Sequence, residues 1–189
     1  MENILSHKRV TIIGVGGIGS HVAVALCRAG VGTLRLIDRD AVDVSNLGRQ
    51  CYTHADVGID KVIALKAYLE QVNPNVHIEV ESRWVSQDTI GDILEKEQFI
   101  IEAVDKATTK AWLTEEILQL PNLICLIGCS GMAGWGDSND IRCKRFRDNW
   151  YVCGDFQSDI DELGKITAAR VMVCAGHMAN KMIQCLSNS

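Results

Sequence analysis

The sequence predicts one α/β domain with a mainly parallel sheet, formed by the whole chain from residue 1 to residue 189. Short β-branched runs alternate with helical stretches, an order that places crossover helices between parallel strands. A glycine-rich turn follows the first of these runs and leads into a helix, as at the start of many doubly wound α/β sheets. The length suits one domain with a substantial core, and the chain contains no internal repeat.

Up to residue 127, aliphatic runs separated by helical patterns predict parallel strands joined by helices. The expected strands are residues 9–13, 33–37, 76–80, 99–103 and 123–127. Helices are expected from the glycine turn to about residue 29 and at residues 60–72, 87–95 and 108–120. Pro74 and Pro121 mark the ends of two of these helices, because the residue before a proline disfavours helical geometry. Residues 41–58 are expected to be irregular.

The remaining third of the chain has a different pattern. Residues 141–145 and 150–153 resemble short strands, which are expected to be antiparallel. A polar connection over 155–165 then leads to a long final helix over 167–186. The predicted fold is therefore a Rossmann-like doubly wound sheet that is parallel in its first half and antiparallel toward the C-terminus.

The net charge of −5 argues against nucleic acid as the main partner, because no basic stripe is present to replace condensed counterions. One basic run, residues 142–147, fits a solvated strand or the docking of an acidic partner or a phosphate. No stretch approaches the ~20 apolar residues of a membrane helix, and the N-terminus lacks signal-peptide character. A cytoplasmic location with no membrane association is the resulting expectation.

Eight cysteines are present, but none forms a Cys-x-x-Cys pair. Cys125 and Cys129 alone lack a second pair at the spacing of structural zinc sites, so no zinc is expected. In a cytoplasmic chain, most of these thiols are expected to be small buried apolar groups.

The glycine turn has the chemistry of a phosphate site. Gly14 permits a tight turn out of the first strand, while Gly16 and Gly17 leave bare backbone for a phosphate to approach. Gly19 allows the following helix to pack closely on the strand. The free N–H groups and the positive end of the helix would stabilise an anion. The same pattern occurs in NAD-dependent dehydrogenases, so the turn alone does not identify the nucleotide.

Residues after the second strand narrow the choice. Asp38 stands at the tip of that strand, 19 residues after Gly19, where a carboxylate can bind ribose hydroxyls. Polar groups follow where α/β sheets bind ligands, at Asp40, Ser45, Asn46, Arg49 and Gln50, with Lys61 at the start of the next helix. A dehydrogenase does not cleave the pyrophosphate of its cofactor and needs little positive charge beside it. The two positive charges of Arg49 and Lys61 instead suit a site where negative charge develops on a transferring phosphate.

Asp105 follows the fourth strand and is suited to Mg²⁺, which uses one or two carboxylates together with phosphate oxygens. Taken singly, Arg49 and Lys61 can be surface charges, and Asp105 can be a helix cap. Taken together with the glycine turn and Asp38, they predict a site that binds and cleaves ATP.

These residues make the sequence resemble the ThiF/MoeB/HesA family, bacterial relatives of the ubiquitin-activating enzymes. The matching motifs are Gly14-x-Gly16-Gly17-x-Gly19-Ser20, Asp38-x-Asp40-x-Val42, Ser45-Asn46-Leu47-x-Arg49-Gln50, Gly58-x-x-Lys61 and Asp105. Two later segments, residues 130–134 and 151–155, look like a short ThiF subgroup usually assigned to thiamine biosynthesis.

The resemblance implies adenylation of the C-terminal Gly-Gly carboxylate of a ubiquitin-like sulfur carrier, with release of pyrophosphate. By position, Asp38 would bind the ribose, residues 45–49 would line the triphosphate, and Asp105 would hold Mg²⁺. Arg49 and Lys61 would stabilise the phosphate charge. No general base is required, because the attacking carboxylate is already ionised at pH 7. The family is usually dimeric, so a homodimer is expected, with the apolar final helix as a candidate interface.

The chain also departs from the longer family members. It lacks their two zinc-binding Cys-x-x-Cys pairs, it has Lys106 and Lys110 where they have Asn and Arg, and residues 155–165 contain no cysteine. The glycine-rich loop at 130–136, with Met132 and Trp135, is the candidate channel for the carrier's tail, or alternatively a mobile loop with a buried tryptophan. Alternative functions are adenylation of a carboxylate on a MoeB-type carrier, tRNA or peptide, an NAD-dependent oxidoreductase, and a non-catalytic binding domain.

Overall fold

The computed structural model describes residues 4–189, except for the side chain of Asp161. Its strands are β1 (Arg9–Ile13), β2 (Thr33–Asp38), β3 (His77–Ser82), β4 (Phe99–Glu102), β5 (Cys125–Cys129), β6 (Arg142–Arg147) and β7 (Trp150–Gly154). Its α-helices are α1 (Gly17–Ala29), α2 (Lys61–Val72), α3 (Gln87–Leu94), α4 (Ala107–Leu118), α5 (Ile160–Leu163) and α6 (Ala168–Ser187). Four short 3₁₀ turns complete the order: η1 (Ile4–His7), η2 (Val44–Asn46), η3 (His54–Asp56) and η4 (Ser138–Asp140).

The strands form one seven-stranded sheet in the order β3-β2-β1-β4-β5-β7-β6. Every neighbouring pair is parallel except β6 and β7, which are antiparallel. The predicted doubly wound sheet with an antiparallel end is therefore confirmed. None of the helices found over residues 4–189 has the length and apolar character needed to cross a membrane.

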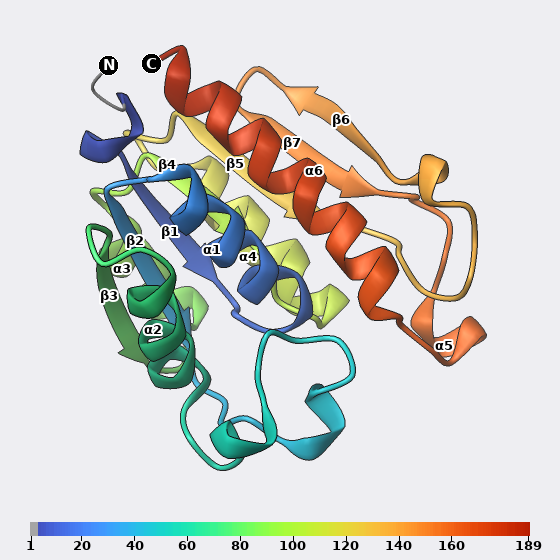
Figure 1. The fold of residues 1–189 in the computed structure, drawn as a ribbon. Coiled ribbons are helices and arrows are strands. Elements are labelled where there is room, and N and C mark those ends of the chain that lie inside the picture. The colour runs from blue at the N-terminus through green and yellow to red at the C-terminus, as the bar shows by residue number, and fades with distance from the viewer. Residues whose placement is uncertain (1–3) are drawn as a thin grey trace.

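Helices cover both faces of the sheet, so the domain has three layers (Figure 1). α1, α2 and α6 lie over one face, where their buried side chains join those of the strands in the larger core cluster. α3 and α4 lie over the other face, where Ile90, Leu94, Leu113 and Ile117 form the smaller cluster with residues of β1, β2, β4 and β5. Burial from both sides explains why β4 and β5 are nearly continuous apolar runs rather than alternating ones.

Local differences from the sequence prediction lie in the loops. The segment predicted to be irregular contains η2 and η3, each stabilised by a reciprocal capping box, at Asp43 with Asn46 and at Thr53 with Asp56. The polar connection over 155–165 includes the short helix α5. β6 extends to Arg147, two residues beyond the predicted end, because the tight turn to β7 begins only after it.

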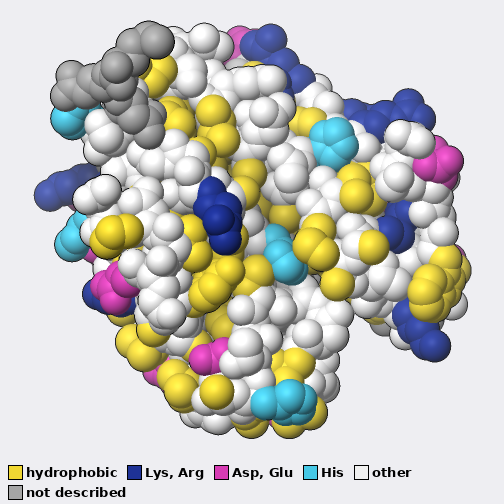
Figure 2. Space-filling view, in the orientation of Figure 1, with side chains coloured by type: hydrophobic (Ala, Val, Ile, Leu, Met, Phe, Trp, Pro, Cys, Tyr) yellow, Lys and Arg dark blue, Asp and Glu magenta, His cyan; other side chains and the backbone are white. Residues whose placement is uncertain are grey.

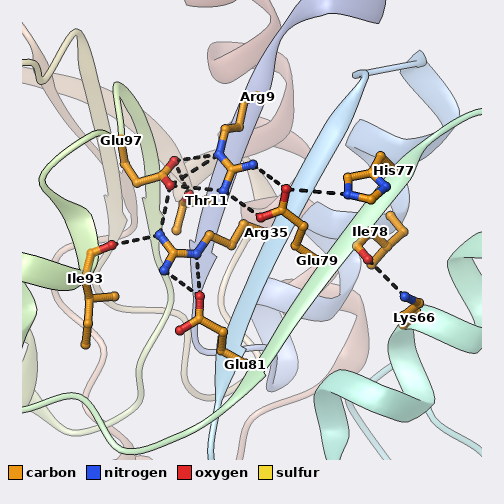
Figure 3. A network of polar contacts seen from close by, with 10 residues as sticks. All are labelled: Arg9, Thr11, Arg35, Lys66, His77, Ile78, Glu79, Glu81, Ile93 and Glu97. Carbon is orange, nitrogen blue, oxygen red and sulfur yellow. Dashed lines mark hydrogen bonds and ion pairs between the residues drawn. The ribbon is translucent and has the colours of Figure 1, made fainter.

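A network of ion pairs lies on the face of the sheet that α3 covers, across β1, β2 and β3 (Figure 3). Arg9 binds Glu79 through two N–H···O bonds of 2.7 and 2.8 Å. Both Arg9 and Arg35 also bind Glu97, whose side chain is almost fully buried. Arg35 additionally pairs with Glu81, so charges from three strands neutralise one another beneath α3.

Replacing Glu97 with glutamine is expected to reduce the free energy of unfolding by about 1–3 kcal/mol, because Arg9 and Arg35 lose a buried charged acceptor. Urea unfolding at pH 7 measures this loss. Burial raises the pKa of Glu97, but hydrogen bonds from Arg9 and Thr11 outweigh it and hold the pKa below its usual value. The stabilisation is therefore present at neutral pH and lost as the pH falls through the folded-state pKa, so the difference between variant and parent should shrink in acid.

Candidate adenylation site

The polar residues predicted for the site lie at one edge of the sheet, where the parallel strands β1, β2 and β4 end. β1 leads into the glycine turn, β2 ends at Asp38, and β4 is followed by Asp105. This edge faces the long loop of residues 39–60 in the lower part of Figure 1. It is also where the strand order reverses, since β1 has β2 on one side and β4 on the other. Open α/β sheets bind ligands at this reversal point.

Two of the glycines are required by packing. Gly14 has a φ of 84°, and a Cβ atom there would lie 2.8 Å from the carbonyl oxygen of Ala103. A Cβ atom on Gly19 would lie only 1.9 Å from the carbonyl oxygen of Gly14. The turn therefore folds tightly against the end of β4, and α1 packs directly on the turn, as predicted from the sequence.

Gly16 and Gly17 differ, because nothing in the surrounding protein prevents them from carrying a side chain. The nearest atoms to an added Cβ are Gln50 Nε2 for Gly16 and the Arg49 carbonyl oxygen for Gly17, both at 3.6 Å, an ordinary contact distance. α1 begins at Gly17, and its N-cap Gly16 offers no side-chain hydrogen bond to the first turn. The N–H groups of that turn are therefore oriented as a helix orients them toward an anion.

This contrast predicts opposite results for two alanine variants. Gly19→Ala is expected to destabilise the fold by about 1–3 kcal/mol or more, because the methyl group overlaps the backbone of Gly14. Gly16→Ala is expected to keep nearly full stability and to weaken ATP binding, because the methyl group enters the space left for phosphate. Thermal unfolding and a nucleotide titration of both variants measure the two effects. A fully stable Gly19→Ala protein would contradict the packing role of this glycine.

The segment that follows η2 is attached to the glycine turn by hydrogen bonds. Tyr52 donates its hydroxyl to the carbonyl oxygen of Val15 at 2.7 Å, and the backbone N–H of Cys51 donates to Ser20 Oγ at 3.2 Å. These contacts hold Arg49 and Gln50 beside Gly16 and Gly17. The side-chain carbonyl oxygen of Gln50, Oε1, is buried and has no hydrogen-bond partner within residues 4–189. It is an acceptor available to a donor on a ligand.

The side chains in and next to η2 form hydrogen bonds with one another. The Ser45 hydroxyl donates to Asp43 at 2.6 Å, and the Asn46 side chain accepts from the Asp43 N–H at 3.3 Å. Arg49 donates one guanidinium hydrogen bond, to the carbonyl oxygen of Ser45 at 3.0 Å. Its other N–H groups make no protein hydrogen bond in the described part of the chain. Arg49 is thus the residue of this segment with free donors for a phosphate.

Asp38 and Asp40 contribute to the structure as well as to the predicted site. Asp38 accepts the N–H of Val15 at 2.8 Å and the N–H of Asp40 at 2.9 Å, so its carboxylate fixes the glycine turn against the end of β2. Each of its oxygens retains a lone pair for another donor. Asp40 forms a 2.9 Å ion pair with Lys61, whose side chain is only 8% exposed. The ammonium of Lys61 is therefore held at the site by Asp40 rather than solvated.

Asp105 is exposed at the end of β4 and makes no hydrogen bond or ion pair with any other residue in the range 4–189. The β4–α4 turn that carries it is fixed by a buried ion pair, in which Lys110 Nζ lies 2.9 and 3.0 Å from the two oxygens of Glu102. Glu102 also accepts the backbone N–H of Val104 at 2.9 Å. Lys110 is therefore committed to supporting this turn.

The structure also brings together a thiol and an imidazole that the sequence did not connect. Cys51 Sγ lies 3.0 Å from His21 Nδ1 at the start of α1. Burial lowers the pKa of His21 and raises the pKa of the Cys51 thiol, so both shifts favour the neutral groups. A reactive thiolate needs the opposite shift. The pair therefore packs the glycine turn and does not form an activated nucleophile.

A second feature missed by the sequence reasoning is a buried ion pair beside the glycine-rich loop of 130–136. Arg170, in the first turn of α6, binds Asp155 and the carbonyl oxygens of Met132, Gly136 and Asp137. Both side chains of the pair are nearly inaccessible. The loop is therefore pinned along its length, while the side chain of Trp135 is 76% exposed. The alternative of a buried tryptophan is wrong.

Over the described residues, no cluster of three or more His, Cys, Asp or Glu side chains is arranged to hold a metal ion. A single free carboxylate, such as Asp105, can still take part in Mg²⁺ coordination when phosphate and water oxygens supply the other ligands.

Comparison with known protein families shows to which family the chain belongs. Residues 2–189 match the ThiF family. The chain belongs to this family. The resemblance stated from the motifs is thereby confirmed, and curated relatives agree with it.

Two curated relatives illustrate the match of this ThiF-family protein. The tRNA threonylcarbamoyladenosine dehydratase of Escherichia coli K12 is 30% identical over 141 residues, covering 74% of this chain and 52% of the relative. The adenylyltransferase and sulfurtransferase MOCS3 of Anopheles gambiae is 32% identical over 117 residues, covering 61% of this chain and 26% of the relative. The chain thus spans about half, or less, of the length of these relatives.

Solved structures share the fold. E. coli TcdA, a tRNA N6-threonylcarbamoyladenosine dehydratase solved in complex with AMP, superposes with a TM-score of 0.86 at 20% identity, over 99% of this chain and 89% of that one. E. coli MccB, solved with succinimide, gives a TM-score of 0.76 at 22% identity, over 98% of this chain and 58% of that one. At these identities the likeness establishes the fold of the ThiF-family protein and nothing further about its chemistry.

Proposed function

We propose that this ThiF-family protein is an ATP-dependent adenylyltransferase that activates the C-terminal Gly-Gly carboxylate of a ubiquitin-like, ThiS-type sulfur carrier. The observation that carries the proposal is the grouping of an uncapped α1 N-terminus, the free donors of Arg49, the buried Lys61 and the unpaired Asp105 at one strand edge. Similarity to relatives named adenylyltransferases supports it. The TcdA structures solved with AMP and ATP support nucleotide binding at this fold's site.

In the proposed reaction, an oxygen of the carrier's carboxylate forms a bond to the α-phosphorus of ATP. The bond from that phosphorus to the oxygen bridging to the β-phosphate breaks, and pyrophosphate leaves. The glycine turn and the first turn of α1 would bind the phosphates, and the free lone pairs of Asp38 would accept hydrogen bonds from the ribose. Arg49 and Lys61 would stabilise the charge that develops on the phosphates.

The site residues fit a magnesium ion as part of the substrate complex. Asp105 offers an exposed, unpaired carboxylate, and the Glu102–Lys110 pair holds its turn in place. Bound Mg²⁺ would neutralise charge on the triphosphate and on the departing pyrophosphate. The contribution of the protein is to present this carboxylate at the strand edge where the glycine turn lies.

The carrier's tail would reach the site along the loop of 130–136, which the Asp155–Arg170 pair holds in place. Trp135 and the exposed Leu163 would give the carrier an apolar contact surface, because large exposed hydrophobic groups commonly anchor protein partners.

The homodimer is also part of the proposal. Figure 2 shows hydrophobic side chains spread over the face of the molecule formed by α1, α2 and α6. Ile63 on α2 and Met172 on α6 are exposed.

A carboxylate on tRNA or on a peptide is the second candidate substrate. It is supported by the similarity to relatives named tRNA threonylcarbamoyladenosine dehydratases, which match the larger share of this chain. The fold-level likeness to MccB solved with the MccA peptide supports the peptide version.

ATP–pyrophosphate exchange by the purified protein tests the proposal. Exchange is expected with a Gly-Gly carrier, such as ThiS, and not with the same carrier lacking its final glycine. Exchange that requires tRNA or a peptide instead would select the second candidate. Absence of exchange with every carboxylate, together with nicotinamide-cofactor binding, would overturn adenylation in favour of an oxidoreductase.

A further inference from the structure

A polar pocket of about 520 Å³ lies between β6, with the η4 turn before it, and α6, at the antiparallel end of the sheet. Arg142 and Lys181 contribute cationic groups to its lining, and His177 contributes an imidazole. The other polar side chains are amides and a serine hydroxyl, and no carboxylate among the described residues lines the pocket. A pocket of this composition favours a small anionic ligand.

The lining includes one nucleophile, Cys143, which is half-buried on β6. Directly opposite it on the antiparallel neighbour β7 stands Cys153, which is fully buried. Residues directly opposite in an antiparallel pair have Cα atoms about 4.5–5.5 Å apart. Disulfides need Cα separations of about 4.4–6.8 Å, so the strand register places this thiol pair within bridging range.

The surroundings of Cys143 favour its thiolate. A hydrogen bond from the Cys153 thiol lowers the pKa of Cys143 most strongly, burial opposes this, and the positive charge of Lys181 lowers the pKa further. Cys153 shows the opposite shift, because the same hydrogen bond and burial raise its pKa. Cys143, the more accessible thiol of the pair, is thus the better nucleophile, and the buried Cys153 is the second to react.

We propose that this pocket binds an anionic low-molecular-weight disulfide of the oxidised glutathione class, with which Cys143 and Cys153 undergo thiol–disulfide exchange. The Cys143 thiolate attacks one sulfur of the bound disulfide, forming a mixed disulfide and releasing one thiolate, which takes up a proton. Cys153 then loses its proton and attacks Cys143 Sγ. A Cys143–Cys153 disulfide forms, and a second low-molecular-weight thiol leaves.

In this reaction two protein thiols are oxidised and one disulfide is reduced to two thiols, so atoms and electrons balance. The product disulfide would join the edge strand β6 covalently to β7. Since Cys153 lies two residues before Asp155, the bond would form next to the ion pair that holds the 130–136 loop.

Incubation of the reduced protein with oxidised glutathione, followed by peptide mapping, tests the proposal. The expected product is a Cys143–Cys153 disulfide. Cys153→Ser is expected to stop at a glutathione adduct on Cys143, and Cys143→Ser is expected to form neither product. Cys27→Ser removes a buried thiol on α1 and is the matched control, expected to react like the parent protein.

The charge of the pocket is tested separately with Lys181→Gln. Because Lys181 also lowers the pKa of Cys143, the variant is expected to react more slowly with both disulfides. The loss of rate should be roughly tenfold greater with oxidised glutathione, which is anionic, than with cystamine, a cationic disulfide. Equal slowing with both disulfides would show that Lys181 does not select the ligand's charge and would overturn the binding part of the proposal.

A second thiol pair, Cys125 and Cys185, provides the competing outcome. A hydrogen bond from Cys125 lowers the pKa of Cys185 to about 7. Formation of a Cys125–Cys185 disulfide instead, or adducts confined to Cys185 or Cys51, would overturn the assignment to Cys143 and Cys153. Because the mapping is done on the parent protein, it decides the question even if a serine variant does not fold.

Discussion

Replacing Arg49 with alanine is expected to lower ATP–pyrophosphate exchange by roughly 10²-fold or more. Arg49 donates one guanidinium hydrogen bond to the carbonyl oxygen of Ser45, and its remaining donors make no hydrogen bond among the described residues. The Arg49 backbone lies beside the turn, since its carbonyl oxygen would be 3.6 Å from a Cβ atom added to Gly17. Removal of the side chain therefore leaves the turn in place and removes only charge from the site.

The same loss is expected for Asp105→Ala, for a different reason. This carboxylate makes no hydrogen bond or ion pair among the described residues, so its removal should spare stability. It should raise the Mg²⁺ concentration that exchange requires. Initial rates of exchange at several Mg²⁺ concentrations, with circular dichroism as a check of folding, measure both variants.

Arg28→Ala and Lys106→Ala serve as controls, because each removes an exposed charged side chain that has no proposed role at the site. Arg28 lies at the other end of α1 from the glycine turn, and Lys106 is the residue after Asp105. Both are expected to retain exchange within about threefold of the parent. Full activity in both Arg49→Ala and Asp105→Ala would show that the roles proposed for these residues are wrong.

Replacing Arg170 with methionine is expected to reduce the free energy of unfolding by about 3–5 kcal/mol. The substitution keeps most of the side-chain volume but leaves the buried Asp155 carboxylate without its cationic partner. It also removes the donor that binds the carbonyl oxygens of Met132, Gly136 and Asp137. Buried charges and carbonyl groups that lose their partners incur the full cost of desolvation.

Urea unfolding of Arg170→Met against the parent protein measures this loss. Arg145→Met is the matched control, because Arg145 forms an ion pair with Asp148 that is exposed on both sides. Its loss is expected to change stability by no more than about 1 kcal/mol. If the two substitutions destabilise equally, the buried pair does not hold the loop as described.

Because the loop of 130–136 is the proposed path for the carrier's tail, Arg170→Met should also affect exchange. At a temperature where the variant remains folded, we expect a higher KM for the carrier and an unchanged affinity for ATP. An equal change in both would place the effect at the nucleotide site instead.

Much of the fold follows from local patterns in the sequence. Short β-branched runs alternating with helical patterns, prolines after helices and the glycine turn predicted the first five strands and most of the helices. The antiparallel end of the sheet was predicted as well, and residues 141–145 and 150–153 are too close in sequence for a crossover helix. The capping boxes of η2 and η3 were missed, although Asp43 with Asn46 and Thr53 with Asp56 have the spacing that signals them.

The site was only partly predictable. The sequence predicted the glycine turn, Asp38, Arg49, Lys61 and Asp105 as a set from their places after strands and at a helix start, and their roles stay a prediction. It did not show that Asp38 binds the glycine turn, that Asp40 holds Lys61, or that Lys110 pairs with Glu102. Each of these contacts joins residues that come together only after strand order and helix placement are known.

The sequence by itself therefore determined the α/β class, the turn that begins α1 and the residue types at the strand ends, because periodicity, glycine geometry and strand-end chemistry are local properties. Only the tertiary structure decided which charges are already paired and which remain free for a ligand. That distinction depends on contacts between distant segments, as between Arg35 and Glu97 or between Lys61 and Asp40. Arg49 and Asp105 have no charged partner among the described residues and are available to a ligand, whereas Lys110 is paired with Glu102 and supports the turn that carries Asp105.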